Sequence, residues 1–393
     1  MRSAQRAADV GADGAAAVLA AHDGAVGRIA TLLLPADTAW GAGGVAHRAP
    51  PPDAAPAAPT AAVDAAARTL KSLGGNAVLL LGAGGAGNGR AQMLAAAIAA
   101  RTGCRVLAEF YNARMPGGRG RPRIERLHYA VDAAVARLAG AQALVLAGSV
   151  EPIGFFAYPG KPSQLKPPGA ALITLAEPRQ DVPAALQALA EALDVRVERD
   201  LVLAPVRPPA LPSGALTLDA VAAAIAATLP ENAVVIDEAV SSGRAFGAPM
   251  AAAAPHDWLP SMGGAIGFGL PGAVGAAIGA PGRPVLALEG DGSAMYTLQA
   301  LWTMAREALP VVVVIFANRA YRILQGELTG VGAQISGQKA VDMLTLDRPA
   351  LDWVALARGH GMDGVRVDEA GALAAALQRG FASRAPCLIE VLL

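Results

Sequence analysis

The segment that decides how this chain folds is Val285-Leu286-Ala287-Leu288-Glu289-Gly290-Asp291-Gly292-Ser293. Four apolar residues in a row suit a strand buried on both faces of a parallel sheet, and the small polar residues after them end that strand. A second apolar run, Val311 to Phe316, follows after about 20 residues, which leaves room for a crossover helix at about 295–308. The segment therefore predicts a β-α-β unit with Asp291 at the carboxyl end of its first strand.

The same alternation of strands and helices extends along most of the chain. Other short apolar runs lie at 76–81, 105–108, 143–147, 171–175, 233–236 and 387–391. Such runs, separated by helical segments, predict an α/β fold with two doubly wound parallel-sheet domains. Proline-rich stretches at 49–59 and 204–212 suit neither a helix nor a central strand, and we interpret them as linkers. They divide the chain into a leader of residues 1–45, a central domain of 60–200 and a C-terminal domain of 213–393.

Composition excludes several classes of protein. Lys plus Arg and Asp plus Glu both number 32, so the balance of charge favours neither nucleic acid nor an anionic membrane as a partner. No run reaches the roughly 20 strongly apolar residues of a spanning helix, and the first residues lack the apolar core of a signal peptide. The two cysteines, Cys104 and Cys387, are too few for a disulfide framework, and we interpret them as buried small side chains. We expect a cytoplasmic protein.

Polar residues follow both strands of the β-α-β unit. Asp291 comes after the first strand and Asn318 after the second, 27 positions later. The carboxyl ends of neighbouring parallel strands lie at one edge of a sheet, so both side chains can face the same point. A carboxylate and an amide oxygen, completed by phosphate and water, are typical ligands of Mg²⁺. The glycines beside Asp291 permit close approach of a phosphate to the backbone.

This arrangement resembles the signature of thiamine diphosphate enzymes, in which Gly-Asp-Gly is followed by Asn after a run of about 25–30 residues. Gly263 to Pro271 (GGAIGFGLP) resembles a segment of the acetolactate synthase and benzoylformate decarboxylase group. Asp237 to Ser242 resembles the acidic, hydroxyl-rich turn that meets the diphosphate in that group, and Leu32 to Trp40 resembles the last strand of its first domain. From about residue 30 onward, the chain resembles the central and C-terminal domains of such an enzyme.

The resemblance implies roles for particular residues. Mg²⁺ would be held by the side chains of Asp291 and Asn318 and by the backbone oxygen of Ala320. The cofactor-binding residues would be Ser241, Ser242, Gly264, Ile266, Gly290, Gly292 and Ser293. Among them, Gly292 and Ser293 would bind diphosphate through their backbone amides, while Ile266 would hold the cofactor in its bent form. The carbonyl of Gly264 would accept from the aminopyrimidine.

The implied function is a thiamine diphosphate- and Mg²⁺-dependent enzyme, or enzyme subunit, that acts on 2-oxo acids. It would be an acetolactate synthase-like carboligase or a decarboxylase, working as a homo-oligomer, either a dimer or a tetramer. The resemblance does not decide between carboligase and decarboxylase, and it does not identify the 2-oxo acid.

One departure from the family pattern concerns the activating glutamate, which in the family lies in a first domain. The leader before the first linker has only about 40 residues, and the first glutamate of the chain is Glu109. The catalytic residue is therefore unassigned, and the leader is interpreted as a remnant of the pyrimidine-binding domain. Three interpretations stay open: a truncated reading frame, a separate chain that supplies the domain, or a non-catalytic cofactor-binding fragment.

Other residues carry weaker signals. Gly82 to Gly87 follows a strand as a dinucleotide-binding loop would, but a lone glycine pattern is a weak signal. A plain tight turn is favoured there, with FAD on the central domain as the lesser alternative. The histidines show no metal-ligand spacing. His256 is expected in a surface loop, with a position facing the substrate cavity as the lesser alternative. Arg322 is expected either on a solvated helix face or against a substrate carboxylate.

Overall fold

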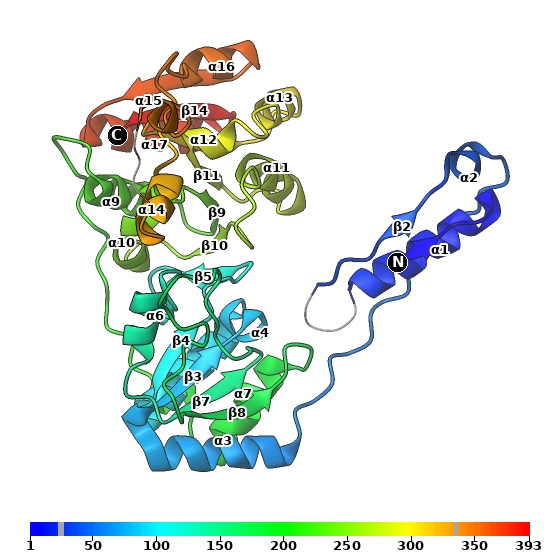
Figure 1. Cartoon of the computed structure of the whole chain (residues 1–393), viewed down its shortest axis with the longest axis vertical. Coiled ribbons are helices and arrows are strands. Elements are labelled where there is room, and N and C mark those ends of the chain that lie inside the picture. The colour runs from blue at the N-terminus through cyan, green and yellow to red at the C-terminus, as the bar shows by residue number, and fades with distance from the viewer. Residues whose placement is uncertain (23–26, 334–336) are drawn as a thin grey trace. The chain divides into compact units, whose positions relative to one another are not determined.

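The structure, a computed structural model, describes residues 1–22, 27–333 and 337–393. The chain divides into two compact units, whose elements are labelled in Figure 1. The first, which we call the central unit, comprises residues 1–109, 135–152 and 164–201. The second, which we call the C-terminal unit, comprises residues 110–134, 153–163 and 202–393. Two segments from the middle of the sequence, 110–134 and 153–163, thus belong to the C-terminal unit.

The leader contains a small β-α-β arrangement. Strand β1 (Arg2–Ser3) pairs in parallel with β2 (Leu32–Leu33), and helix α1 (Val10–Ala21) lies between them in the sequence. A short helix, α2 (Ala36–Trp40), follows. The interpretation of the leader as a domain remnant stays a prediction.

The central sheet has the parallel order β4-β3-β7-β8. Its strands are β3 (Ala77–Leu81), β4 (Arg105–Ala108), β7 (Ala143–Ala147) and β8 (Ala171–Ala176). The helices of this part of the sequence are α3 (Thr60–Leu73), α4 (Ala83–Ala86), α5 (Gly89–Thr102), α6 (Val131–Leu138), α7 (Val182–Ala192) and α8 (Val197–Asp200). Every residue of β3 and β7 is buried, as continuous aliphatic runs predict.

The turn after β3 is explained by packing. A Cβ atom at Gly82 would lie 1.8 Å from the carbonyl oxygen of Gly148, which follows β7. Only glycine therefore allows the ends of these two strands to come so close. Within this segment Ala83–Ala86 form the short helix α4 rather than a plain tight turn, and the question of FAD stays open.

The C-terminal sheet has the order β13-β14-β12-β11-β9-β10-β5, in which β5 is antiparallel and the other strands are parallel. The strands are β5 (Met115–Gly117), β9 (Ala233–Glu238), β10 (His256–Pro260), β11 (Val285–Gly290), β12 (Val311–Ala317), β13 (Asp363–Val367) and β14 (Cys387–Leu392). The helices are α9 (Leu218–Thr228), α10 (Gly247–Ala251), α11 (Gly269–Gly279), α12 (Asp291–Ala294), α13 (Ala300–Arg306), α14 (Arg322–Gly330), α15 (Gln338–Asp342), α16 (Trp353–Gly359) and α17 (Ala370–Ser383). The described residues also contain a two-residue strand, β6 (Glu125–Arg126), and three 3₁₀ turns, η1 (Ala7–Asp9), η2 (Gly74–Asn76) and η3 (Ser242–Ala245).

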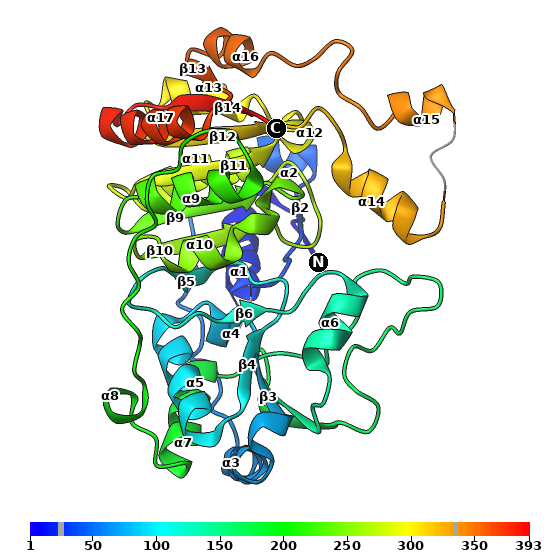
Figure 2. The ribbon, with the colours of Figure 1, turned by 90° about the vertical axis from the view of Figure 1, so that its left-hand side faces the viewer.

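Helices cover both faces of this sheet (Figure 2). Alternate residues of each strand point to opposite faces, so Val235 belongs to one apolar cluster with α9 and α17, while Val234 and Ile236 belong to another with α11, α13 and α16. The two clusters form the core of the unit. The α/β fold with parallel sheets is confirmed.

Several local expectations were incomplete or wrong. The strands β5, β10 and β13 were not predicted, and the crossover helix expected at about 295–308 begins later, as α13. His256 is not in a surface loop: it starts β10, is 3% exposed, and its Nδ1 lies 2.7 Å from the carbonyl oxygen of Ala254. Burial lowers the pKa of His256, because the protonated, charged ring would lose its contact with water.

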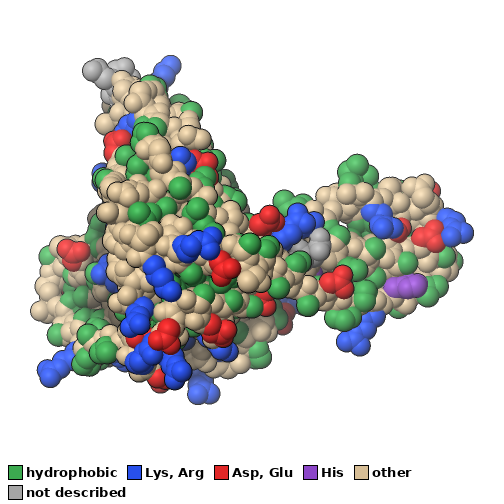
Figure 3. Space-filling view, turned by 90° about the horizontal axis from the view of Figure 1, so that it is seen from below, with side chains coloured by type: hydrophobic (Ala, Val, Ile, Leu, Met, Phe, Trp, Pro, Cys, Tyr) green, Lys and Arg blue, Asp and Glu red, His purple; other side chains and the backbone are tan. Residues whose placement is uncertain are grey.

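The surface shows no obvious sorting of charge on the face drawn in Figure 3, where Lys and Arg side chains lie among Asp and Glu. This distribution agrees with the equal numbers of cationic and anionic residues. None of the helices in the described ranges has both the length and the apolar character needed to cross a membrane.

Candidate functional site

The candidate site lies where the order of strands in the C-terminal sheet reverses. The chain passes from β9 to β10 on one side and then to β11 on the other side of β9. At such a switch point the loops after adjacent strands diverge and leave room for a ligand at the carboxyl ends. The residues that follow β9, β11 and β12 therefore define the site.

Asp291 and Asn318 meet at one turn. The Asp291 carboxylate accepts hydrogen bonds from the backbone N–H of Arg319 at 2.6 Å and of Gly292 at 3.0 Å. The side-chain oxygen of Asn318 accepts from the backbone N–H of Ala320 at 3.0 Å. Arg319 has a φ of +54°, which folds the backbone tightly between the two contacts. The structure thus brings the three predicted metal-binding positions together.

The environment of Asp291 suits a cation. Asp291 is only 3% exposed. Burial raises the pKa of its carboxyl, while the backbone N–H donors of Arg319 and Gly292 oppose that rise. A buried carboxylate gains more from a bound cation than an exposed one, because water screens the pair less.

The predicted hydroxyl groups lie around the same point. The Asn318 amide donates to Ser241 Oγ at 3.5 Å, and Ser242 is buried in η3. Ser293 uses its hydroxyl within the protein, where it donates to the carbonyl oxygen of Gly290 at 3.1 Å. A side chain at Gly292 is excluded, because a Cβ atom there would lie 2.7 Å from the ring of Tyr321.

A glycine-rich segment, Gly263 to Gly269, forms the other side of the site. The Glu238 carboxylate accepts hydrogen bonds from three of its backbone amides: Gly267 at 2.8 Å, Phe268 at 3.3 Å and Gly269 at 2.8 Å. These bonds orient the loop that carries Gly264 and Ile266, and they leave the Ile266 side chain 40% exposed. Glu238 therefore acts as a buried acceptor for the loop.

Sequence reasoning missed a group of buried carboxyl groups beneath the site. Glu289 is fully buried, and neither of its carboxyl oxygens has a hydrogen-bond partner among the described residues. Burial and the facing carboxyls of Glu238 and Asp237 raise the pKa of Glu289 well above its usual range. Asp237 accepts from the indole N–H of Trp258 at 3.0 Å. Acidic residues at matching ends of the adjacent strands β9 and β11 were the available signal.

Glu109, the first glutamate of the sequence, lies in the other unit. It follows β4 and accepts a hydrogen bond from the backbone N–H of Val150 at 2.9 Å. Burial raises the pKa of its carboxyl. The contact gives Glu109 a local structural role in the central unit.

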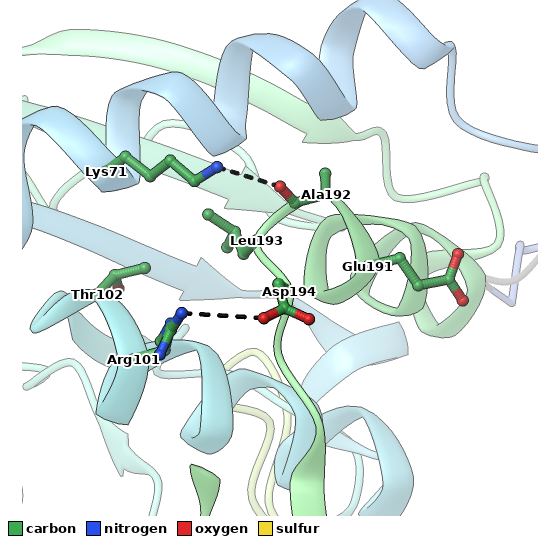
Figure 4. A pocket seen from close by; sticks show the side chains of 7 residues that line it. All are labelled: Lys71, Arg101, Thr102, Glu191, Ala192, Leu193 and Asp194. Carbon is green, nitrogen blue, oxygen red and sulfur yellow. Dashed lines mark hydrogen bonds and ion pairs between the residues drawn. The ribbon is translucent and has the colours of Figure 1, made fainter. Parts of the chain in front are cut away.

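A pocket in the central unit is lined by seven residues: Lys71, Arg101, Thr102, Glu191, Ala192, Leu193 and Asp194 (Figure 4). Its charged groups already have partners, since Lys71 donates to the Ala192 carbonyl at 3.3 Å and Arg101 lies 3.9 Å from the Asp194 carboxylate. These contacts tie the ends of α3, α5 and α7 together. They give no indication of a ligand.

The donor set at the switch point fits a magnesium diphosphate group. Asp291 and Asn318 offer hard oxygen atoms, and the backbone N–H of Gly292 lies beside them, where it donates to the Asp291 carboxylate at 3.0 Å. Within residues 1–22, 27–333 and 337–393, no three His, Cys, Asp or Glu side chains gather as a metal cage. Magnesium commonly uses few protein oxygens and takes the rest from phosphate and water, so two side chains and a backbone oxygen suffice.

Comparison with known proteins agrees with this geometry. Residues 241–391 match the family model described as the thiamine pyrophosphate enzyme, C-terminal TPP binding domain. The chain is 45% identical over 392 residues to the "Putative acetolactate synthase large subunit IlvX" of Mycobacterium tuberculosis, covering 100% of this chain and 74% of the relative. It is 36% identical over 213 residues to benzoylformate decarboxylase of Pseudomonas aeruginosa, and this match covers 54% of this chain and 39% of the relative.

A solved structure gives the same result. The thiamine diphosphate-dependent 4-hydroxybenzoylformate decarboxylase of Rhodococcus jostii superposes with a TM-score of 0.78 at 26% identity, over 99% of this chain and 75% of that one. By fold and site, the protein is a cofactor-binding α/β protein of the doubly wound class. The chain belongs to the thiamine diphosphate-dependent enzyme family that includes acetolactate synthase and benzoylformate decarboxylase. The resemblance expected from the sequence is confirmed.

Proposed function

We propose that this chain is an enzyme, or an enzyme subunit, that uses thiamine diphosphate and Mg²⁺ to act on a 2-oxo acid, as a carboligase or a decarboxylase. The observation that carries the proposal is the meeting of Asp291 and Asn318 at the turn that contains Ala320. The proposed cofactor-binding domain is residues 213–393, and the proposed assembly is a homo-oligomer.

The protein residues would divide the binding of the cofactor between two sides. Asp291, Asn318 and the carbonyl of Ala320 would hold Mg²⁺, and the backbone of Gly290, Gly292 and Ser293, with Ser241 and Ser242 nearby, would hold the diphosphate. Gly264 and Ile266 would position the aminopyrimidine end. When bound, the cofactor supplies the carbon nucleophile and the electron sink that the cleavage of a 2-oxo acid needs.

Glu238 would contribute by positioning. Its three hydrogen bonds to the backbone of Gly267, Phe268 and Gly269 hold the loop of Gly264 and Ile266 in one conformation. A loop fixed before the ligand arrives loses less conformational entropy on binding.

The test is calorimetry of thiamine diphosphate binding in the presence of Mg²⁺. Asp291→Ala should abolish Mg²⁺-dependent binding with an unchanged circular dichroism spectrum, whereas Asn318→Asp should retain it because an oxygen ligand remains. Asp368→Ala, which removes an exposed aspartate of the same unit, is the matched control. Unchanged cofactor affinity in Asp291→Ala would refute the assignment. Release of CO₂, or formation of a carbon–carbon bond between two 2-oxo acids, then separates the two reactions.

A further inference from the structure

Six aromatic side chains form one connected cluster in the C-terminal unit: Phe110, Tyr111, Tyr129, Phe155, Phe156 and Tyr158. Ring centroids of neighbours lie between 4.7 Å and 6.5 Å apart. The chain has only seven Phe and five Tyr, so half of them gather here. Phe155 and Phe156 are 43% and 52% exposed, and this aromatic cluster therefore presents open ring surface rather than completing a core.

The aromatic cluster borders the candidate site at two places. At one, the ring of Phe155 lies 3.6 Å, and the hydroxyl of Tyr111 4.0 Å, from where a Cβ atom at Gly264 would be. At the other, the Tyr158 hydroxyl donates to Glu327 Oε2 at 2.8 Å. Glu327 lies on α14, the helix that begins just after the turn of Asn318 and Ala320. The aromatic cluster therefore contacts both the glycine-rich loop and α14, the helix that follows the turn of Asn318 and Ala320 in the sequence.

Glu327 has no cationic partner in the part of the chain that the structure describes. The lysine nearest in sequence to Tyr158, Lys161, is paired with Asp132. Arg126 lies at the other end of the cluster, 5.4 Å from the centroid of the Phe110 ring. Burial, and the contact with Glu327, raise the pKa of Tyr158, and burial likewise raises the pKa of Tyr129, so both hydroxyls stay neutral donors. Glu327, which accepts from the Tyr158 hydroxyl, is thus a carboxylate without a cationic partner among the described residues, beside open aromatic faces.

We propose that the aromatic cluster and Glu327 bind a guanidinium or ammonium group on the side chain of the substrate. Cations are attracted to the faces of aromatic rings and form strong hydrogen bonds with carboxylates. A neutral aryl group would cover Glu327 without supplying a positive charge to balance it, which is unfavourable for a charged group. An anionic side chain would be repelled. That the substrate is a 2-oxo acid rests on the proposed function, whereas recognition of the cation does not.

The first experiment uses cofactor-free chain and a matched pair of probes, n-butylguanidinium and its neutral isostere n-butylurea. Affinities are measured by NMR titration. We expect n-butylguanidinium to bind about tenfold more tightly, in line with the strength of charge-assisted hydrogen bonds. Glu327→Gln should remove this preference, and Glu231→Gln, which removes an exposed glutamate elsewhere in the unit, should leave it unchanged. The double variant Phe155→Leu/Phe156→Leu should weaken the cation about threefold or more.

Several results would overturn the inference: equal affinity for the two probes in the parent chain, a preference for the cation that survives Glu327→Gln, or tighter binding of benzamide than of n-butylguanidinium. Tyr158→Phe, which keeps the ring and removes only the hydroxyl, should retain the cation preference and serves as the variant least able to disturb folding. Loss of the preference in Tyr158→Phe with Glu327 intact would contradict the direct role of the carboxylate.

Thiamine diphosphate calorimetry on the same samples separates this inference from the proposed function. Cofactor binding without a cation preference would refute the inference alone, while a cation preference without cofactor binding would refute the proposed function alone. If both hold, the chain loaded with cofactor should bind 5-guanidino-2-oxopentanoate about tenfold more tightly than 2-oxohexanoate, and Glu327→Gln should reduce the difference to less than about twofold. Equal binding of these two acids would refute the assignment of the cation site to the substrate.

Discussion

Glu238→Gln tests whether a buried carboxylate holds the glycine-rich loop. In the native structure three backbone amides, those of Gly267, Phe268 and Gly269, donate to this carboxylate. Glutamine keeps one oxygen, so the amide of Gly269 would face the NH₂ group and lose its acceptor. A buried donor without a partner costs about 1–3 kcal/mol, and the remaining bonds weaken by about 1 kcal/mol because the acceptor is no longer charged.

At the lower end of these costs, we expect local opening of the loop to become about 2 kcal/mol easier. That change corresponds to roughly 30-fold faster amide exchange at Gly267 and Gly269 when exchange follows the opening equilibrium. Native-state hydrogen exchange at pH 7 measures it, with Glu231→Gln as the control for loss of an exposed charge. Glu238→Ala should give a larger effect. Exchange within about threefold of the parent rate in Glu238→Gln would refute the reasoning.

Three further predictions concern packing, acid stability and thiol reactivity. Gly82→Ala should destabilise the central unit by about 3 kcal/mol in urea unfolding, because its Cβ atom would overlap the Gly148 carbonyl, whereas Gly89→Ala has open space and should be neutral. Burial raises the pKa of Asp257, but hydrogen bonds from Arg114 and Arg283 outweigh burial and leave the pKa below its usual 3.8. The stability that Asp257 contributes is therefore present above pH 3.8 and is lost as the pH falls through the native pKa. Asp257→Asn should flatten the decline in the free energy of unfolding below about pH 4. Partial burial and Asp363 raise the pKa of Cys387 to about 11, so at pH 8 its reaction with a disulfide reagent should be more than tenfold slower than that of a free thiol of pKa about 8.5. An equal rate would contradict this raised pKa.

Most strands of both sheets could be predicted because each of these is a short aliphatic run with a clear end. β4 and β7 begin and end at the residues expected from the sequence, and β11 and β12 extend the expected runs by one or two residues. Strands buried on both faces leave this uniform pattern. β10, with the sequence His256-Asp257-Trp258-Leu259-Pro260, does not, because the antiparallel edge strand β5 and the ion pair of Asp257 with Arg283 stabilise it instead of aliphatic packing.

The candidate metal site could also be predicted, since its residues follow strands that are neighbours in the sheet and carry small or oxygen-bearing side chains. The proximity of the buried carboxyls could not be predicted. Glu238 and Glu289 lie 51 positions apart, and their proximity depends on the pairing of β9 with β11, which no local pattern specifies. Gly269 illustrates how close the two strands bring these groups. A Cβ atom at this position would lie 1.7 Å from Glu289 Oε1, so the packing requires glycine.

The two ends of the site differ in how the chain builds them, and this difference bears on specificity. The proposed metal end consists of backbone groups and small side chains on the turns after β11 and β12, where most substitutions would clash or remove a proposed ligand. The aromatic cluster comes from residues 110–158, which are far from those turns in sequence, and it contacts the glycine-rich loop near Gly264 and helix α14 at Glu327. Side chains there can change without disturbing the cofactor turns. Relatives with the same turns can therefore act on different substrates, and the substrate of this chain has to be inferred from Glu327 and the rings beside it.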